Sequence, residues 1–289
     1  MIDAIKDNHY RLLNLACGSK VSETGNWIDV DFMSPIDRVI RMNILEGLKF
    51  EDNSFDVVYS AQFIEHLTLE QAITVWSEIN RVLKPGGIVR IVTPDLEELA
   101  QSYLHLLSLL KTNHSTSVEK KYDWIRLEIF DQVLRNSTGG QMVEYFQNDD
   151  EEISKFLLER LGFSYLSSIN SEASYRKKSV FEFLRKVLIK LPLKIKELST
   201  SIFLSSDAKV GKFRRSGEVH QYLHDFVSIT RILKSTNFVQ ISRESPSSSS
   251  IPDWQQYKLD VIDGVEDGPL AMYIEARKNL NKSPRFPLI

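Results

Sequence analysis

The sequence predicts an α/β fold with a mostly parallel sheet. A helical insertion interrupts the part of the chain that forms this domain. Three observations predict this fold. Residues 11–93 alternate between short strands and short connections, residues 96–215 follow mostly helical periodicity, and strand periodicity returns after Gly217. We therefore expect one domain formed by residues 1–95 and 216–280. The inserted residues would serve as a substrate cap, or as a surface for a membrane or a partner.

The composition narrows the classes of function. The 289 residues are 42% hydrophobic and 26% charged, and 36 Lys+Arg against 39 Asp+Glu give a formal net charge of −3, which disfavours a nucleic-acid-binding protein. The single cysteine, Cys17, excludes a disulfide framework and argues against a thiolate zinc site. No run of about 18 uncharged apolar residues appears. The N-terminus has acidic residues and no secretory signal, so we expect a cytoplasmic protein.

Three strands open the chain. Residues 11–17 are an apolar run ended by Gly18, which is typical of a strand that is buried on both faces. Residues 26–32 alternate between apolar and polar side chains, and residues 37–43 follow as a third strand. Strands that alternate with helices along the chain predict a parallel, right-handed α/β sheet.

Two more strands and a helix complete the first half of the domain. Residues 55–60 form the fourth strand, and residues 69–83 form an amphipathic helix. Thr68 and Gln71 have the spacing of a capping box at the start of this helix. A Pro-Gly-Gly sequence then ends the helix, and residues 88–92 form the fifth strand.

The sheet is completed from the C-terminal part of the chain. Residues 225–235 predict a helix in which Asp225 is the N-cap. Residues 238–243 and 271–278 predict the last two strands, with a serine-rich loop between them.

Polar residues follow the first three strands at one edge of the predicted sheet. Ligands of open α/β sheets bind outside the carboxyl ends of the strands. Gly18 would let a ligand approach the backbone, Asp31 would accept two ribose hydroxyls, and Asn43 would read an adenine amino group. The second strand begins within about eight residues of Gly18, which leaves no room for the helix that binds a pyrophosphate. A ligand with ribose and adenine but no phosphate fits better, and S-adenosyl-L-methionine is such a ligand.

Several segments carry a family resemblance. LNLACG, WIDVD, LKFEDNSFDVVYSAQFIEHL and EINRVLKPGGIVRIVTPD resemble, in order and spacing, the motifs of class I S-adenosylmethionine-dependent methyltransferases of the type 11 kind. Later segments are similar to methyltransferase-like proteins of bacterial surface-polysaccharide biosynthesis clusters, namely residues 131–142, 217–226, 249–260 and 270–278. The resemblance implies a Rossmann-like seven-stranded sheet with an antiparallel last strand. It also implies methyl transfer to an oxygen of a sugar or glycan-linked acceptor.

The resemblance also implies which residues hold the cofactor: Asn14, Ala16, Gly18, Asp31, Asn43, Ser60 and Gln62. The first motif departs from the family pattern, since Asn14 replaces an acid and Ala16 and Lys20 replace glycines. Asn43 stands where an aspartate is common. These departures leave open an alternative, a degenerate copy of the fold that binds or scaffolds without catalysis.

Two histidines are candidates for acid–base catalysis. His66 follows the fourth strand and would line the site or act as a base, or would pack on the sheet at a helix start beside Glu65. His220 is the preferred acid–base or substrate-orienting residue. His220 and His224 lie four apart, which on a helix is a metal-ligand spacing. Because no third ligand cluster is visible, the sequence predicts no metal site.

Candidate substrate contacts lie outside the cofactor motifs. Arg135 precedes a Gly-Gly turn and would clamp a phosphate or carboxylate, or would only end a helix. Tyr222 matches an aromatic position of the resembling family. Residues 176–196 hold eight basic residues and one acid among apolar residues. This stretch would contact the inner face of a membrane peripherally, pack on a partner, or act as a lid.

Overall fold

The computed structural model describes residues 10–24, 27–112, 115–146, 150–168, 206–214 and 217–280. The described residues form two compact units. The first is drawn from residues up to 101 and from 221 onward, and the second from residues 102–220. We expected the inserted segment to span residues 96–215, and the division places its limits a few residues later along the chain. The peptide bond between His220 and Gln221 joins the second unit back to the first.

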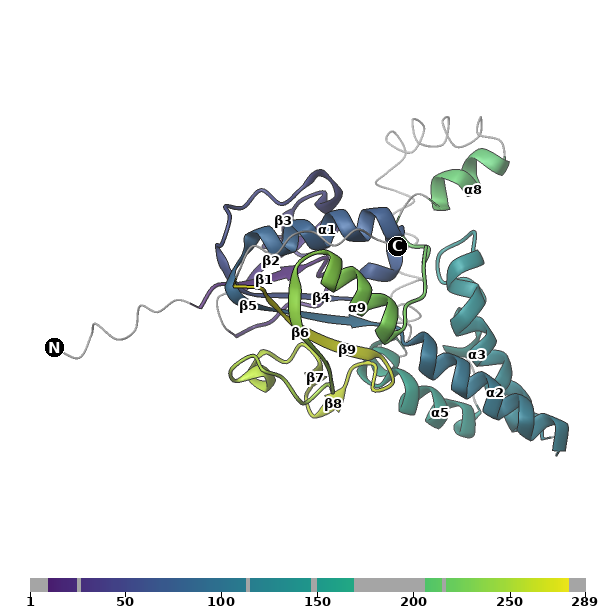
Figure 1. Cartoon of the computed structure of the whole chain (residues 1–289). Helices are drawn as coiled ribbons and strands as arrows, with labels where there is room; N and C mark the ends of the chain where they lie inside the picture. Colours follow the sequence, from purple (N-terminus) through teal and green to yellow (C-terminus); the bar gives the residue numbers. More distant parts are fainter. Residues whose placement is uncertain are drawn as a thin grey trace. The chain divides into compact units, whose positions relative to one another are not determined.

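The first unit holds a seven-stranded sheet with the order β3-β2-β1-β4-β5-β9-β6 (Figure 1). Its strands are β1 (Leu12–Leu15), β2 (Trp27–Asp31), β3 (Ile40–Arg41), β4 (Phe55–Ala61), β5 (Leu83–Thr93), β6 (Phe238–Glu244) and β9 (Met272–Lys278). The first five strands pair in parallel. The last strand, β9, lies between β5 and β6 and is antiparallel to both. The predicted Rossmann-like sheet with an antiparallel last strand is confirmed.

Alternate residues of the strands face two separate cores. Leu13 and Leu15 pack with the buried faces of α1 (Leu69–Val82) and α9 (Phe226–Ser235), which lie side by side on one face of the sheet (Figure 1). Leu12 and its neighbours on the opposite face pack with an aromatic cluster that includes Tyr59, Trp27 and Trp254. Trp254 opens η3 (Trp254–Tyr257) in the segment after β6, so that segment covers the face of the sheet that lacks α1 and α9.

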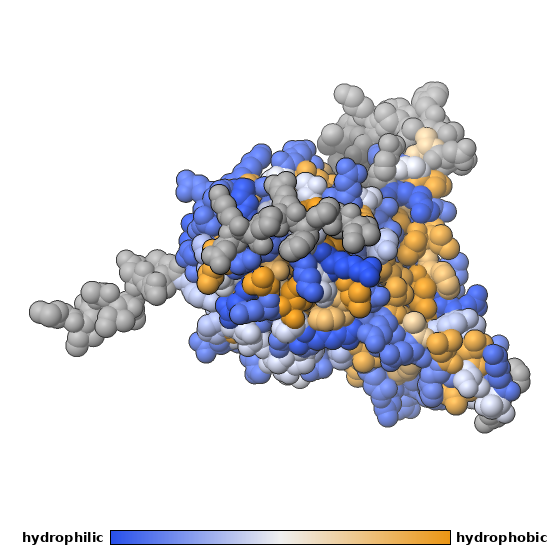
Figure 2. Space-filling model, viewed as in Figure 1, coloured by the Kyte–Doolittle hydropathy of each residue, from blue (hydrophilic) through white to orange (hydrophobic). Residues whose placement is uncertain are grey.

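The second unit is helical. Its helices are the part of α2 (Leu96–Thr112) from residue 102 onward, α3 (Thr116–Leu134), α4 (Val143–Phe146), α5 (Glu151–Leu161) and α8 (Ser206–Arg214). The core of this unit is formed around Trp124, Ile125 and Leu157. Apolar side chains also gather on its surface (Figure 2), among them Leu104, Leu109, Phe130 and Leu134. Within the described residues, no helix is both long enough and apolar enough to cross a membrane.

Local sequence signals are confirmed where they rest on helix caps. Thr68 and Gln71 form the predicted capping box, and the Asp225 side chain accepts a hydrogen bond from the Ser228 N–H at the start of α9. The third strand is shorter than predicted, because the side chain of Asn43 caps the 3-10 helix η1 (Ile44–Glu46) and turns the chain away from the sheet. Residues 220–224 precede this helix and are not helical, so the helical spacing of His220 and His224 does not apply.

Candidate functional site

The candidate cofactor edge is built where β1 and β2 end. The backbone N–H of Gly18 donates to Asp31 Oδ2 at 2.9 Å, and the N–H of Met33 donates to Asp31 Oδ1 at 2.7 Å. Gly18 has φ +53°, and a Cβ added there would meet nothing within 4 Å. The chain therefore offers an open stretch of backbone beside a carboxylate whose oxygens keep further lone pairs for a ligand.

Asn14 has a structural role beneath this edge. Its side-chain amide donates to Asp29 Oδ1 at 2.9 Å and to the carbonyl of Lys20 at 2.8 Å, and the residue is buried. Burial raises the pKa of Asp29, while the Asn14 amide and Arg38 oppose this shift. Asn14 thus holds the loop that follows β1. The neighbouring Ala16, where the family pattern has glycine, takes the left-handed φ of +54° that glycine favours.

The other predicted cofactor residues lie at the ends of β3 and β4. Asn43 uses its amide within its own turn, accepting from the Leu45 N–H at 3.2 Å and donating to Glu46 at 2.8 Å. Ser60 is buried near the end of β4. Gln62, in the next turn, has φ +52°, and its N–H donates to the Val92 carbonyl at 2.8 Å. Their assignment to the cofactor stays a prediction.

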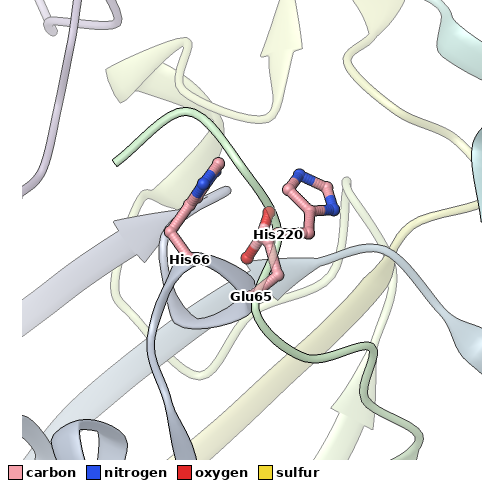
Figure 3. A group of neighbouring side chains, drawn as sticks. All are labelled: Glu65, His66 and His220. Carbon is pink, nitrogen blue, oxygen red and sulfur yellow. The ribbon is translucent and has the colours of Figure 1, made fainter. Parts of the chain in front are cut away.

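A glutamate that the sequence did not single out as catalytic is central to the second half of the site. Glu65 and His66 lie on the 3-10 helix η2 (Ile64–His66), directly after β4 (Figure 3). The Glu65 side chain is fully buried, and its Oε2 accepts a hydrogen bond from Thr93 at 3.1 Å. Burial raises the pKa of Glu65 to about 7, against the lowering effect of its hydrogen bonds. The adjacent acid and imidazole were the signal that sequence reasoning could have used.

Main-chain hydrogen bonds hold the segment after residue 220 against Glu65. The Glu65 carbonyl accepts the N–H of Gln221 at 2.7 Å and the N–H of Tyr222 at 3.2 Å. The peptide bond from Gln221 therefore fixes the backbone of His220 beside Glu65. Glu65, His66 and His220 each offer a ligand atom, and these atoms lie within 4.8 Å of one another (Figure 3). Two predicted catalytic histidines, His66 and His220, are thus brought together with Glu65.

His224 and Tyr222 lie on the same segment but differ in exposure. His224 is buried, its Nδ1 lies 3.3 Å from Ser228 Oγ, and burial lowers its pKa to about 4. Tyr222 is half exposed, and its ring centroid lies 4.8 Å from that of His224. Because this segment is not helical, the four-residue spacing of His220 and His224 does not make them a metal-ligand pair.

Arg135 belongs to the second unit. It is the C-cap of α3 and forms ion pairs with Asp131 at 3.4 Å and with Glu218 at 3.6 Å. These contacts fit a helix end, yet Arg135 also lines a cavity of about 680 Å³ within this unit, together with Phe130. A role for Arg135 in substrate binding stays a prediction. The basic stretch 176–196, and with it the predicted membrane contact, lies outside the described residues.

Comparisons with known proteins point to one class of domain. Residues 27–91 match the family described as a methyltransferase domain. The chain is 44% identical over 48 residues to a probable methyltransferase, ltbC, of Aspergillus luteorubrus, a match that covers 16% of this chain and 17% of that protein.

Solved structures resemble the chain only distantly. A SAM-dependent methyltransferase from Archaeoglobus fulgidus shares 13% identity, with 94% of this chain and 87% of that chain covered and a TM-score of 0.39. The [4+2]-cyclase SpnF shares 24% identity over 31% of this chain and 40% of that chain, with a TM-score of 0.25. Resemblances at this level do not identify an activity.

Proposed function

We propose that this protein is an S-adenosylmethionine-dependent methyltransferase that transfers a methyl group to a hydroxyl oxygen of a sugar or glycan-linked acceptor. The observation that carries the proposal is the methyltransferase-domain match over β2 to β5 on a sheet whose strand ends hold Gly18 and Asp31. The acceptor class is supported by the similarity of the later segments to methyltransferase-like proteins of polysaccharide biosynthesis.

The residues at the edge of the sheet fit the cofactor. Asp31 stands beside the open backbone of Gly18 and can accept ribose hydroxyls. The next two side chains, Phe32 and Met33, are 62% and 72% exposed, so apolar side chains next to Asp31 are available to contact an adenine. When bound, S-adenosyl-L-methionine supplies a methyl carbon that a nucleophile can attack, with the sulfonium sulfur as the leaving group.

The chain's own part in the reaction is orientation and proton transfer. A hydroxyl oxygen that attacks the methyl carbon forms the O–C bond as the C–S bond breaks, and the sulfur keeps the electron pair. The acceptor must then lose its proton. His220 accepts this proton, beside Glu65 and His66. The partly exposed Tyr222 and the cationic Arg135 are assigned to acceptor binding.

A specific observation favours the second candidate, a non-catalytic copy of the fold. Both N–H groups of the Asn14 amide are used in holding Asp29 and the Lys20 carbonyl, and this uncharged side chain brings no negative charge toward a cofactor ammonium group. Such a copy would keep the fold without binding the cofactor.

Calorimetry with S-adenosylmethionine and S-adenosylhomocysteine separates the two candidates. We expect micromolar binding of both ligands, weakened in Asp31→Ala by the loss of one or two charge-assisted hydrogen bonds, about 1.5–3 kcal/mol each. Asp37→Ala, on the exposed turn after β2, is the matched control and should bind like the wild type. Absence of binding of either ligand would establish the non-catalytic copy, and equal affinity in Asp31→Ala would refute the assigned site.

His220→Ala tests the acceptor half. Turnover should fall while the affinity for S-adenosylhomocysteine stays within about twofold, because His220 faces the acceptor and not the adenosine. A loss of cofactor affinity with unchanged turnover per bound cofactor would move His220 to the cofactor pocket.

A further inference from the structure

The group formed by Glu65, His66 and His220 has the composition of a metal site. Two imidazoles and one carboxylate are the donor set that binds borderline divalent cations such as Zn²⁺, Fe²⁺, Co²⁺ and Mn²⁺. One ligand atom from each residue lies within 4.8 Å of the other two (Figure 3). A cation about 2.0–2.2 Å from each ligand would bring the three atoms to about 3–3.5 Å apart.

The burial of Glu65 supplies an independent reason for a cation. Its side chain is 0% exposed, and among the described residues its Oε1 has no hydrogen-bond partner while Oε2 accepts from Thr93. A buried carboxylate without compensation is costly, and it either takes up a proton or binds a cation. Thr93, bonded to the second carboxylate oxygen, is placed as the outer partner that orients a metal-bound carboxylate.

The backbone also preorganises the third ligand. The carbonyl of Glu65 accepts two N–H groups, from Gln221 and Tyr222, so the chain that carries His220 is tied to the same residue that supplies the carboxylate. Ligands held by rigid neighbouring backbone lose little entropy when a metal binds.

We propose that Glu65, His66 and His220 bind one divalent transition-metal ion. Glu65 and His220 are buried and His66 is half-buried, so three protein ligands leave coordination positions for water or for an acceptor oxygen. The catalytic part of this proposal rests on the proposed function. A metal-bound acceptor hydroxyl loses its proton to water, and its oxygen then attacks the methyl carbon as the C–S bond breaks. In that state His220 holds the metal and does not itself take the proton.

Direct metal titration of the full chain tests the site without any methyl transfer. Metal-free protein is titrated by calorimetry with Zn²⁺, Co²⁺ and Mn²⁺, and the Co²⁺ complex is followed by its visible ligand-field absorption. We expect one ion per chain and a Co²⁺ spectrum typical of nitrogen and oxygen ligands. If none of the three ions binds with that stoichiometry, the proposal is wrong.

Variants assign the ligands. Glu65→Gln and His220→Ala should each weaken metal binding by more than about 100-fold, and Thr93→Val by about 10-fold, as expected for an outer partner. His105→Ala, which removes an exposed histidine of α2, is the matched control and should bind as tightly as the wild type. Equal metal affinity in the wild type, Glu65→Gln and His220→Ala would overturn the assignment.

Two further measurements separate a lost metal site from a misfolded variant and from a failure of the proposed function. The thermal unfolding midpoint of each metal-free variant shows whether it folds, and His66→Ala, at the half-buried ligand, replaces Glu65→Gln if the latter does not fold. S-adenosylhomocysteine binding is measured on the same metal-free samples. Cofactor binding without metal binding refutes only the metal site, whereas metal binding without cofactor binding refutes only the proposed methyltransferase.

Discussion

The ammonium group of Lys20 forms an ion pair with the carboxylate of Asp267. Lys20 lies in the loop after β1, and Asp267 directly follows β8 (Val265–Glu266), the second strand of the small hairpin that begins with β7 (Val261–Ile262). The Lys20 side chain is 24% exposed and that of Asp267 is 8% exposed. The lysine that departs from the family's glycine pattern thus ties the candidate cofactor loop to the C-terminal part of the sheet unit.

Lys20→Met should destabilise the protein by about 1–3 kcal/mol, because it leaves the mostly buried Asp267 carboxylate without its cation. Urea unfolding measures this change. The matched control is Lys258→Met, which removes an ion pair with Asp263 in which both side chains are more than half exposed, and it should leave the midpoint unchanged. Equal changes in the unfolding midpoint of Lys20→Met and Lys258→Met would show that the ion pair between Lys20 and Asp267 does not stabilise the fold.

Arg90 is the second site where stability should depend on one side chain. Its guanidinium is fully buried, contacts Asp260 at 2.7 Å and Glu275 at 2.8 Å, and also donates to the carbonyls of Ser245 and Ser248. Arg90→Met should cost about 3–5 kcal/mol, since two buried carboxylates lose their cation.

The shape of the guanidinium matters as well as its charge. Arg90→Lys should also destabilise the protein, because one ammonium group cannot reach all these acceptors. Chemical denaturation compares both variants with Arg126→Met, whose half-exposed pair with Asp123 should contribute less than about 1 kcal/mol. A tolerated Arg90→Lys would show that the carbonyl contacts contribute little.

Glu65 should give the metal-free protein an unusual dependence of stability on pH. Its folded-state pKa of about 7 lies above the ordinary value of 4.5, so the folded state holds an extra proton between these two values. The contribution of Glu65 to the free energy of unfolding is therefore greatest below about pH 4.5. This contribution, on the order of 3 kcal/mol, is lost as the pH rises through 7.

Glu65→Gln removes this dependence. The difference in unfolding free energy between Glu65→Gln and the wild type should move in favour of the variant as the pH rises from 4.5 to 7.5. The difference isolates Glu65 from His224, whose pKa of about 4 has the opposite effect and weakens the fold on acidification below pH 6.5. A pH-independent difference would show that Glu65 is not protonated in the fold.

Gly140 should tolerate no side chain. It has φ +54°, and a Cβ there would overlap the carboxylate of Asp131, whose Oδ1 accepts the Gln141 N–H at 2.9 Å. Gly140→Ala should cost at least about 1–3 kcal/mol from the backbone conformation alone. Gly211→Ala, inside α8 with open space around it, is the control and should stabilise its helix by about 0.5–1 kcal/mol. Thermal unfolding of both variants checks this contrast.

The strands and caps were predictable because their signals are local. Periodicity located β1, β2, β4, β6 and β9 within a few residues, and the capping boxes at Thr68 and Asp225 fixed two helix starts. The third strand was overestimated because the Asn43 side chain caps η1 instead of continuing the strand. A side-chain-to-backbone competition of this kind is not visible in hydrophobic periodicity.

The candidate site was only partly predictable, because it depends on pairings that are distant along the chain. His66 and His220 were chosen separately, and nothing in the spacing of residues 220–224 showed that the N–H groups of Gln221 and Tyr222 bond to the Glu65 carbonyl. The four-residue spacing would have paired His220 with His224 only on a helix, and this segment is not helical. Glu65 could not be singled out from the sequence, because its burial and the missing hydrogen-bond partner of its Oε1 among the described residues are properties of the folded chain.

The position of β9 has a consequence for synthesis on the ribosome. Because β9 inserts between β5 and β6, a nascent chain that has only just released residues 83–93 carries β5 as an open edge. Arg90 on that edge cannot form its ion pairs with Asp260 and Glu275 until the entire helical insertion and these two residues have been translated. Until then the nascent chain exposes the open edge of a hydrophobic strand whose buried cation has no carboxylate partner, which is a surface prone to aggregation.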